Sequence, residues 1–160
     1  LGLVGQPLPT EAPRLLDRLR RAGYTPIVAC IGVTQDGQLL NVNADMLAAQ
    51  LAVNLEVSRL IILGATAGVL DSNGHSLTRL DDADVEQLVA SGDITAGMVA
   101  KLDACRLASR NGVDSVIIAD GRRASDLDLL PGTVITASGG PTNPQASALT
   151  EKTDKKGSGS

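Results

Sequence analysis

The chain has 160 residues and a formal charge of −4, from 14 basic and 18 acidic side chains, with a pI near 4.9. This balance excludes a general electrostatic attraction to nucleic acids or to anionic membranes. Tyr24 is the only aromatic residue, so a base-stacking surface is also excluded, and no apolar run approaches the ~20 residues that span a bilayer.

Helical and extended patterns alternate along residues 10–136. The helical segments place apolar residues on one face, and the strands are short β-branched runs, which are typical of strands covered on both faces. The expected order is helix 10–22, strand 26–33, turn 35–38, strand 39–42, helix 44–55, strand 59–63, turn 71–74, helices 82–90 and 96–110, and strands 113–119 and 133–136. Strands that alternate with helices predict an α/β fold with a largely parallel sheet.

The composition of the two chain ends and the spacing of the two cysteines lead to three further expectations. Residues 137–160 are rich in Ser, Thr, Gly, Pro and Lys, so we expect a flexible tail or linker there. The first residues include neither an initiator Met nor a signal-peptide pattern, so we expect an excerpt from a longer protein. Cys30 and Cys105 form no C-x-x-C pair and accompany a single histidine, which predicts free thiols and no metal site.

Polar side chains gather where the strand at 39–42 meets the next helix. Asn41, Asn43 and Asp45 alternate along this segment, and residues two apart in an extended chain face the same side. Groups of this kind at a helix start commonly cap backbone N–H groups. The alternative is a ligand site, because crevices outside strand ends bind ligands in open α/β sheets.

Two further segments could approach an anionic ligand. Residues 64–68 follow a predicted strand and contain two glycines, which allow a close backbone approach, although a tight turn is the simpler explanation. Lys101 lies beside the apolar stripe of Met98, Leu102 and Cys105 in the helix at 96–110. Its ammonium either extends to water or stands near the helix start, where it could hold a phosphoryl group.

Five motifs in a fixed order carry a resemblance to a known family. They are Pro26-Ile27-Val28-Ala29 with Gly32-Val33, Asn41-x-Asn43-Ala44-Asp45, Ala67-Gly68-Val69-Leu70-Asp71, Thr95-x-Gly97-Met98-x-x-Lys101 and Ile118-x-Asp120-Gly121-Arg122. Together they resemble the C-terminal half of the N-acetylglutamate kinases, within the amino acid kinase family. The resemblance implies a three-layer αβα sandwich with a mainly parallel sheet, here without the family's N-terminal half. Residues 1–136 would form the C-terminal, ATP-binding part.

The resemblance also implies roles for the matching residues. Lys101 and Asp45 would be catalytic: Lys101 would stabilise the phosphoryl group in transfer, and Asp45 would orient the lysines around it. Asn41 and Asn43 would bind the acylated amino acid. The residues implied to contact the nucleotide are Ala65, Thr66, Ala67, Gly68, Val69, Leu70, Asp93, Ile94 and Thr95.

The small-molecule partners implied are N-acetyl-L-glutamate and ATP, with Mg²⁺ held mainly by the phosphates. We also expect a cytoplasmic homo-oligomer that binds neither nucleic acid nor membrane. One departure concerns Gly64-Ala65, where many relatives have Ser/Thr-Asp. A polar contact to the nucleotide or its magnesium would then be missing, whereas backbone contacts could survive.

The activity implied is ATP-dependent phosphorylation of the γ-carboxylate of N-acetyl-L-glutamate in arginine biosynthesis, with this chain inactive by itself. A related alternative is a kinase for another acyl-amino acid, such as carrier-linked α-aminoadipate. An alternative of another class is a kinase-like regulatory domain that binds arginine or nucleotide without turnover. The presence of both Asp45 and Lys101 favours an active kinase.

Overall fold

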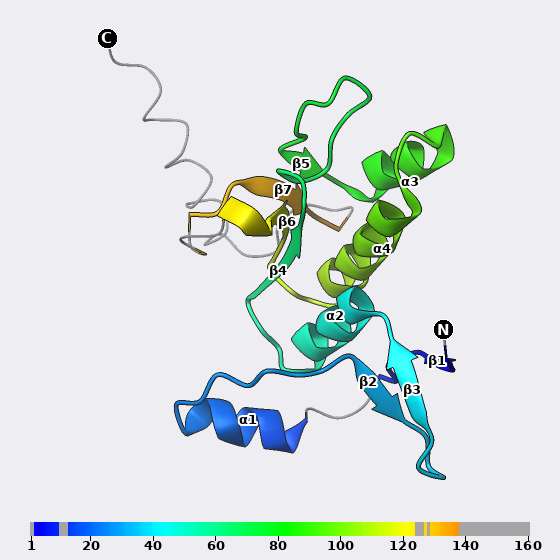
Figure 1. Ribbon diagram of the computed structural model, residues 1–160. Helices are drawn as coiled ribbons and strands as arrows, with labels where there is room; N and C mark the ends of the chain where they lie inside the picture. Colours follow the sequence, from blue (N-terminus) through cyan, green and yellow to red (C-terminus); the bar gives the residue numbers. More distant parts are fainter. Residues whose placement is uncertain (1, 10–12, 124–126, 128, 138–160) are drawn as a thin grey trace.

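The computed structural model describes residues 2–9, 13–123, 127 and 129–137. Within these residues the strands form a three-stranded and a four-stranded sheet (Figure 1). The first, in the order β1-β3-β2, contains β1 (Val4–Gly5), β2 (Ile31–Val33) and β3 (Leu39–Val42). The second, in the order β4-β6-β7-β5, contains β4 (Arg59–Gly64), β5 (Arg79–Leu80), β6 (Ser115–Asp120) and β7 (Gly132–Ile135).

Most of the strand pairs in these sheets are parallel. β1 pairs with β3, β4 with β6 and β5 with β7 in parallel, whereas β2–β3 and β6–β7 are antiparallel. β4 and β6 pair from Arg59 opposite Ser115 to Gly64 opposite Asp120. The carboxyl ends of both strands therefore meet at Gly64 and Asp120, a place called the carboxyl edge below. The expectation of an α/β fold with a mainly parallel sheet is confirmed.

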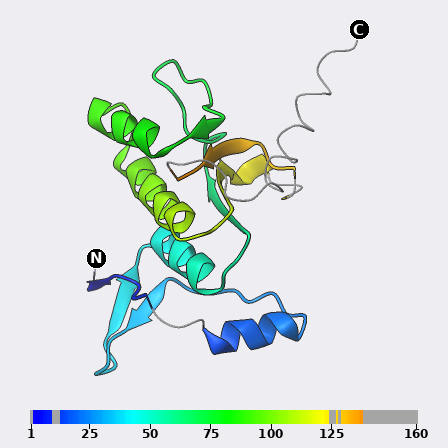
Figure 2. The same ribbon diagram turned by 180° about the vertical axis from the view of Figure 1, so that it is seen from behind.

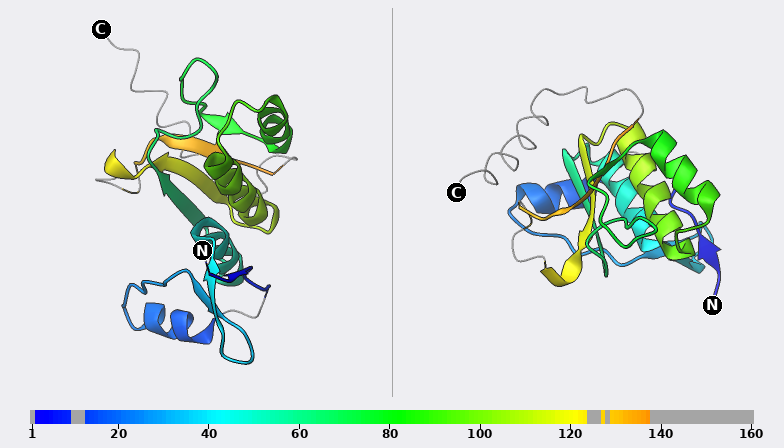
Figure 3. Two further views of the ribbon diagram at one scale, coloured as in Figure 1. Left: turned by 45° about the vertical axis from the view of Figure 1, so that its right-hand side comes forward. Right: turned by 90° about the horizontal axis from the view of Figure 1, so that it is seen from above.

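Four α-helices lie in the described part of the chain: α1 (Arg14–Arg21), α2 (Ala44–Asn54), α3 (Asp82–Ser91) and α4 (Ala96–Arg110). A short 3₁₀ turn, η1 (Gly121–Arg123), follows β6. The helices α2, α3 and α4 lie together on one side of the four-stranded sheet, with α2 packed on α4 (Figure 3). None of these helices is long and apolar enough to cross a membrane.

Side chains at the helix starts explain why three of the helices begin where they do. Asn43 Oδ1 accepts the Met46 N–H at 3.1 Å and caps α2. Thr95 Oγ1 accepts the Met98 N–H at 3.3 Å and caps α4. Asp81 opens α3 with a reciprocal capping box. The predicted starts of α2 and α4 are therefore confirmed.

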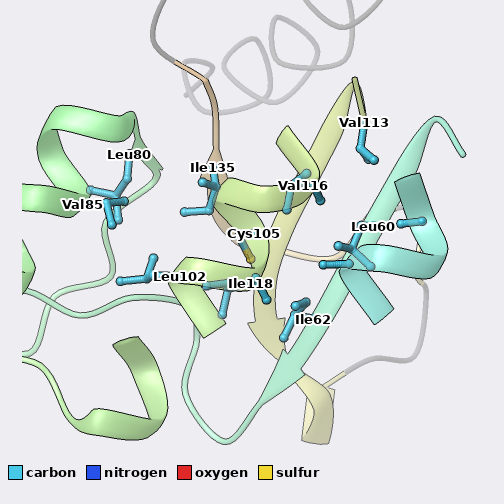
Figure 4. Packing of buried hydrophobic residues seen from close by; sticks show 14 of the residues in the cluster. Leu60, Ile62, Leu80, Val85, Leu102, Cys105, Val113, Val116, Ile118 and Ile135 are labelled. Atoms are coloured by element: carbon cyan, nitrogen blue, oxygen red, sulfur yellow. The ribbon is translucent and has the colours of Figure 1, made fainter. Parts of the chain in front are cut away.

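The core lies between the four-stranded sheet and α2, α3 and α4 (Figure 4). Ile118 of β6 belongs to the cluster against these helices, whereas its neighbour Ile117 belongs to a second cluster with Leu130. Because neighbouring residues of a strand point to opposite faces, β6 is covered on both sides, as its sequence predicts. The largest fully buried side chains are Leu102, Ile118, Ile135, Val69, Val85, Val116, Thr133 and Cys105.

Residues 26–33 differ from the sequence prediction. Only Ile31–Val33 pair as a strand, and the run is not buried: Ile27 is 97% exposed and Ile31 is 62% exposed. β2 packs chiefly on β3 in an antiparallel hairpin whose turn contains Gly37, with a φ of 85°. The predicted turn at 35–38 is confirmed. The prediction of a strand covered on both faces is wrong, because most of residues 26–33 are exposed and none is buried.

The first helix also differs from its prediction. α1 begins at Arg14, and residues 10–12 lie outside the described residues. None of its side chains is buried, although its leucines suggest a packed face. Arg20 and Arg21 pair with Asp17 at 3.3 Å and 2.8 Å, so local ion pairs support this helix. Figure 2 shows α1 and the β2–β3 hairpin at the end of the molecule away from the four-stranded sheet.

Two strands lack a sequence prediction, namely β1 and β5. Each contains only two residues, which is too short for a periodic pattern. The expected tail at 137–160 lies outside the described residues, apart from Ala137.

Candidate active site

Asp45 and Lys101 form an ion pair between two helices. Asp45 lies in the first turn of α2, and Lys101 lies in α4, 56 residues further along the chain. Lys101 Nζ is 2.9 Å from Asp45 Oδ1 and 3.0 Å from Oδ2, and the two side chains are 23% and 21% exposed. Because water is largely excluded, the carboxylate holds the ammonium in one place, unlike the mobile head of a fully exposed lysine.

The Lys101 side chain lies beside the carboxyl edge. A Cβ placed on Gly64 would be 3.9 Å from Lys101 Cε, so the lysine stem passes close to the end of β4. Cys105, one helical turn beyond Lys101, is fully buried. Burial and the negative charge of Asp45 raise the pKa of the Cys105 thiol to about 12, while the Lys101 charge acts in the opposite direction. The thiol stays protonated near neutral pH and serves as apolar packing next to the ion pair.

Asn41 and Asn43 stand apart from this ion pair. Asn43 uses its Oδ1 to cap α2, and Asn41 lies in β3 opposite Val4 and Ile31. Both asparagines are exposed. In the part of the chain that the structure describes, no hydrogen bond joins either amide to Asp45 or Lys101. The capping interpretation is confirmed for Asn43, and the binding role of both asparagines stays a prediction.

The predicted nucleotide loop at 65–70 is anchored on β7. The Val69 N–H donates to Thr133 Oγ1 at 2.8 Å, and the Thr133 hydroxyl donates to the Leu77 carbonyl at 2.5 Å. Gly68 has a φ of 122°, and a Cβ there would lie 2.5 Å from Thr133 Oγ1. Only glycine fits this close approach. Thr133 therefore largely determines the path of the loop.

The residues of the loop at 65–70 differ in their exposure to solvent. Gly68 and Val69 are buried, whereas Ala65 and Ala67 are exposed, and Thr66 and Leu70 are intermediate. A ligand at the carboxyl edge would meet the exposed residues, while Val69 supports them from the core.

The second predicted nucleotide segment, Asp93 to Thr95, leads into α4. Ile94 packs against the core, Asp93 is exposed, and Thr95 caps the helix. A Cβ on Gly97 would meet no atom within 4 Å, so the first turn of α4 is open. An open helix start favours anions through its N–H groups and dipole. Lys101 follows one turn later on the same helix.

Asp120 and Arg122 form a second ion pair at the carboxyl edge. Arg122 Nη2 is 2.9 Å from Asp120 Oδ2, and Arg122 Nε is 3.0 Å from Oδ1. Both residues belong to the motif Ile118-x-Asp120-Gly121-Arg122, and the resemblance implies no role for either of them. The available signal is an acid-Gly-Arg tripeptide directly after an apolar strand. Thr133, which anchors the loop, carries no comparable signal in the sequence.

The carboxyl edge therefore presents two cationic side chains, each held by a carboxylate. The preorganised ammonium of Lys101 can neutralise negative charge on a phosphoryl group. Among the described residues, no three His, Cys, Asp or Glu side chains gather as a metal site. The carboxylates of Asp45 and Asp120 are engaged by Lys101 and Arg122. Asp45 and Asp120 do not form a ligand set for a divalent cation by themselves.

Residues 2–120 match the amino acid kinase family, and the chain belongs to this family. Its α/β fold is therefore the fold of the amino acid kinase family. The chain is 42% identical to the acetylglutamate kinase of Zymomonas mobilis over 122 residues, which are 76% of this chain and 40% of that protein. It is 44% identical to the acetylglutamate kinase of Serratia proteamaculans over 130 residues, which are 81% of this chain and 50% of that protein.

The chain is also similar to a protein of solved structure. The crystal structure of smu.665 from Streptococcus mutans superposes with a TM-score of 0.69 and 34% identity, over 77% of this chain and 47% of that chain. The chain thus spans half or less of the length of these similar proteins.

Proposed function

We propose that this chain is the ATP-binding part of an acetylglutamate kinase. The complete protein would transfer the γ-phosphoryl group of ATP to the γ-carboxylate of N-acetyl-L-glutamate in arginine biosynthesis. The observation that carries the proposal is the Asp45–Lys101 ion pair beside the carboxyl edge. The names of the relatives at 42% and 44% identity support it. Residues 1–136 would form this part of the kinase domain, and 137–160 a tail or linker.

The reaction demands positioning and charge neutralisation more than covalent chemistry by the protein. An oxygen of the acceptor carboxylate forms a bond to the γ-phosphorus while the bond from phosphorus to the β–γ bridging oxygen breaks. ADP leaves with that electron pair. Both reactants are anions, so repulsion between them opposes their approach.

Lys101 would reduce this repulsion. Its ammonium has three N–H donors, two of which meet the Asp45 oxygens, so one remains for an oxygen of the phosphoryl group. Asp45 would hold the ammonium in place before the substrates bind, which avoids reorganisation during the reaction. The Asp45 carboxylate would orient a charge and would not transfer a proton.

The remaining predicted residues would bind the two substrates. Asn41 and Asn43 would contact the acylated amino acid, and residues 65–70 and 93–95 would contact ATP. Mg²⁺ would enter with the ATP phosphates, in agreement with carboxylates that are already engaged by cations. We further propose that the complete protein is a cytoplasmic homo-oligomer.

The test measures steady-state kinetics of the complete protein that contains this chain. Lys101→Ala should lower kcat by about 100-fold or more, the scale of one preorganised electrostatic group. Asp45→Asn should also reduce kcat, because it removes the charge that holds the ammonium. The matched control is Asp103→Asn, an exposed carboxylate on the same helix, which should leave turnover unchanged.

Circular dichroism should show that both site variants remain folded. Near-normal turnover of a folded Lys101→Ala variant would reject the catalytic role. Binding of ATP by the wild-type protein without any phosphorylation would instead favour a regulatory kinase-like domain.

A further inference from the structure

We infer that Arg122 is a positioning residue for the nucleotide, because its guanidinium holds the backbone at Ala65 where the loop at 65–70 leaves β4. The inference deepens the proposed function and rests on it. The Arg122 side chain joins three places: the end of β6, the η1 turn and the start of the loop.

The Arg122 guanidinium is fixed from the strand end. Asp120 is only 6% exposed, and it accepts the Arg122 N–H and Nε–H at its Oδ1 and the Nη2–H at its Oδ2. These hydrogen bonds fix the orientation of the guanidinium plane, although the Arg122 side chain is 71% exposed. The Asp120 carboxylate also raises the pKa of Arg122, so the guanidinium keeps its charge.

The orientation directs one N–H at the loop. Arg122 Nη2 donates to the Ala65 carbonyl at 2.5 Å. Ala65 is the first residue beyond the β4–β6 ladder, which ends at Gly64 opposite Asp120. Neither Gly64 nor Ala65 has a polar side chain that could hold the backbone locally. The Arg122 guanidinium therefore holds the backbone at Ala65, the first residue that the β4–β6 ladder no longer holds.

The loop is thus held at both ends by side chains from other strands and turns. Arg122 bonds to the Ala65 carbonyl, and Thr133 accepts the Val69 N–H. The residues between these anchors include the exposed Ala67, which is available to a ligand. A loop that is already ordered loses less conformational entropy when it binds a nucleotide, so the anchor should strengthen ATP binding. Arg122 itself needs no contact with the substrates for this effect.

The experiment compares Arg122→Ala and Arg122→Lys in the complete protein. Arg122→Ala should raise KM for ATP by about 10-fold, the scale of one charge-assisted hydrogen bond. The kcat and the KM for the acyl-amino acid should change by less than about 3-fold, because Lys101 and Asp45 are untouched. Arg122→Lys should show an intermediate KM, because a single ammonium cannot reproduce the planar fork. The control is Arg79→Ala, which removes an exposed arginine from β5 of the same sheet.

A second measurement is independent of ATP. In the free protein, Arg122→Ala should accelerate amide hydrogen exchange at residues 65–68 and leave exchange in β6 unchanged. Unchanged loop exchange together with an unchanged KM for ATP would overturn the inference, as would an equal rise of KM in Arg79→Ala. If wild-type protein binds no ATP, the proposed function fails, and the exchange rates alone then decide whether Arg122 anchors the loop.

Discussion

Two regions of this chain have equally apolar strands but differ in how far these are buried. The N-terminal region comprises β1, α1, β2 and β3, and the C-terminal region comprises α2, α3, α4 and β4 to β7. Among the described residues, Val42 is the only buried hydrophobic side chain of the N-terminal region, whereas β6 alone contributes Val116, Ile117, Ile118 and Ala119. Apolar sequence therefore predicts burial only where another element is present to cover it.

The residues of the candidate site are also divided unequally between these two regions. The Asp45–Lys101 pair, the loop at 65–70 and the Asp120–Arg122 pair all belong to the C-terminal region. Only Asn41 comes from the N-terminal region, where it is exposed on β3. The packed region thus holds the groups expected to bind ATP. The amino-acid side of the site would depend on the region whose apolar surface is uncovered.

The largest difference between the two regions is expected in the alkylation rates of their cysteines. Cys30 of the N-terminal region is partly exposed, whereas Cys105 of the C-terminal region is fully buried, with its pKa raised to about 12. Alkylation requires an exposed thiolate, and at mildly alkaline pH the Cys105 thiol is still protonated. Iodoacetamide should modify Cys30 at least about 1,000-fold faster than Cys105, as measured by peptide mass spectrometry. In denaturing urea the two rates should become similar, and similar rates without urea would contradict the contrast.

The next largest difference between the two regions is expected in the free energy of unfolding that an isoleucine-to-alanine substitution removes. Ile118→Ala in β6 removes a fully buried side chain and should lower the free energy of unfolding by about 3 kcal/mol, through lost burial and a cavity. Ile31→Ala in β2 changes a side chain that is 62% exposed, and it should cost less than about 1 kcal/mol. Urea unfolding of this chain, followed by circular dichroism, measures both values. Equal losses would mean that β2 is packed in solution.

The smallest expected effect concerns self-association. The exposed apolar side chains of the N-terminal region include Ile27 and Ile31, and β2 is an edge strand of its sheet. Such surfaces and edges promote association between chains. We expect this chain to self-associate, and the double substitution Ile27→Lys with Ile31→Lys should weaken association by about 10-fold, as measured by light scattering over a concentration series. The control is Leu129→Lys, at an exposed position of the C-terminal region, which should change little.

Local sequence determined the elements whose signals lie within a few residues. Asn43 and Thr95 start α2 and α4, Gly37 shapes the hairpin turn, and the continuous apolar run of β6 predicts a strand covered on both faces. The position of Lys101 near a helix start leaves phosphoryl binding as one of two alternatives, and only the resemblance implies catalytic roles for Lys101 and Asp45. The Asp45 carboxylate and the Lys101 ammonium are consistent with an ion pair, but their separation of 56 positions in the sequence gives no information about their distance in space.

Tertiary structure decided what depends on contacts between distant segments. Packing of α2 on α4 brings Asp45 to Lys101, and the β6–β7 pairing places Thr133 under the loop at Gly68. The same holds for the exposure of residues 26–33, which share an apolar, β-branched character with the buried β6 run. A residue's type fixes its preference for apolar surroundings or for a charged partner. Whether the preference is satisfied depends on which other elements fold against it, because burial and ion pairing are properties of contacts between segments.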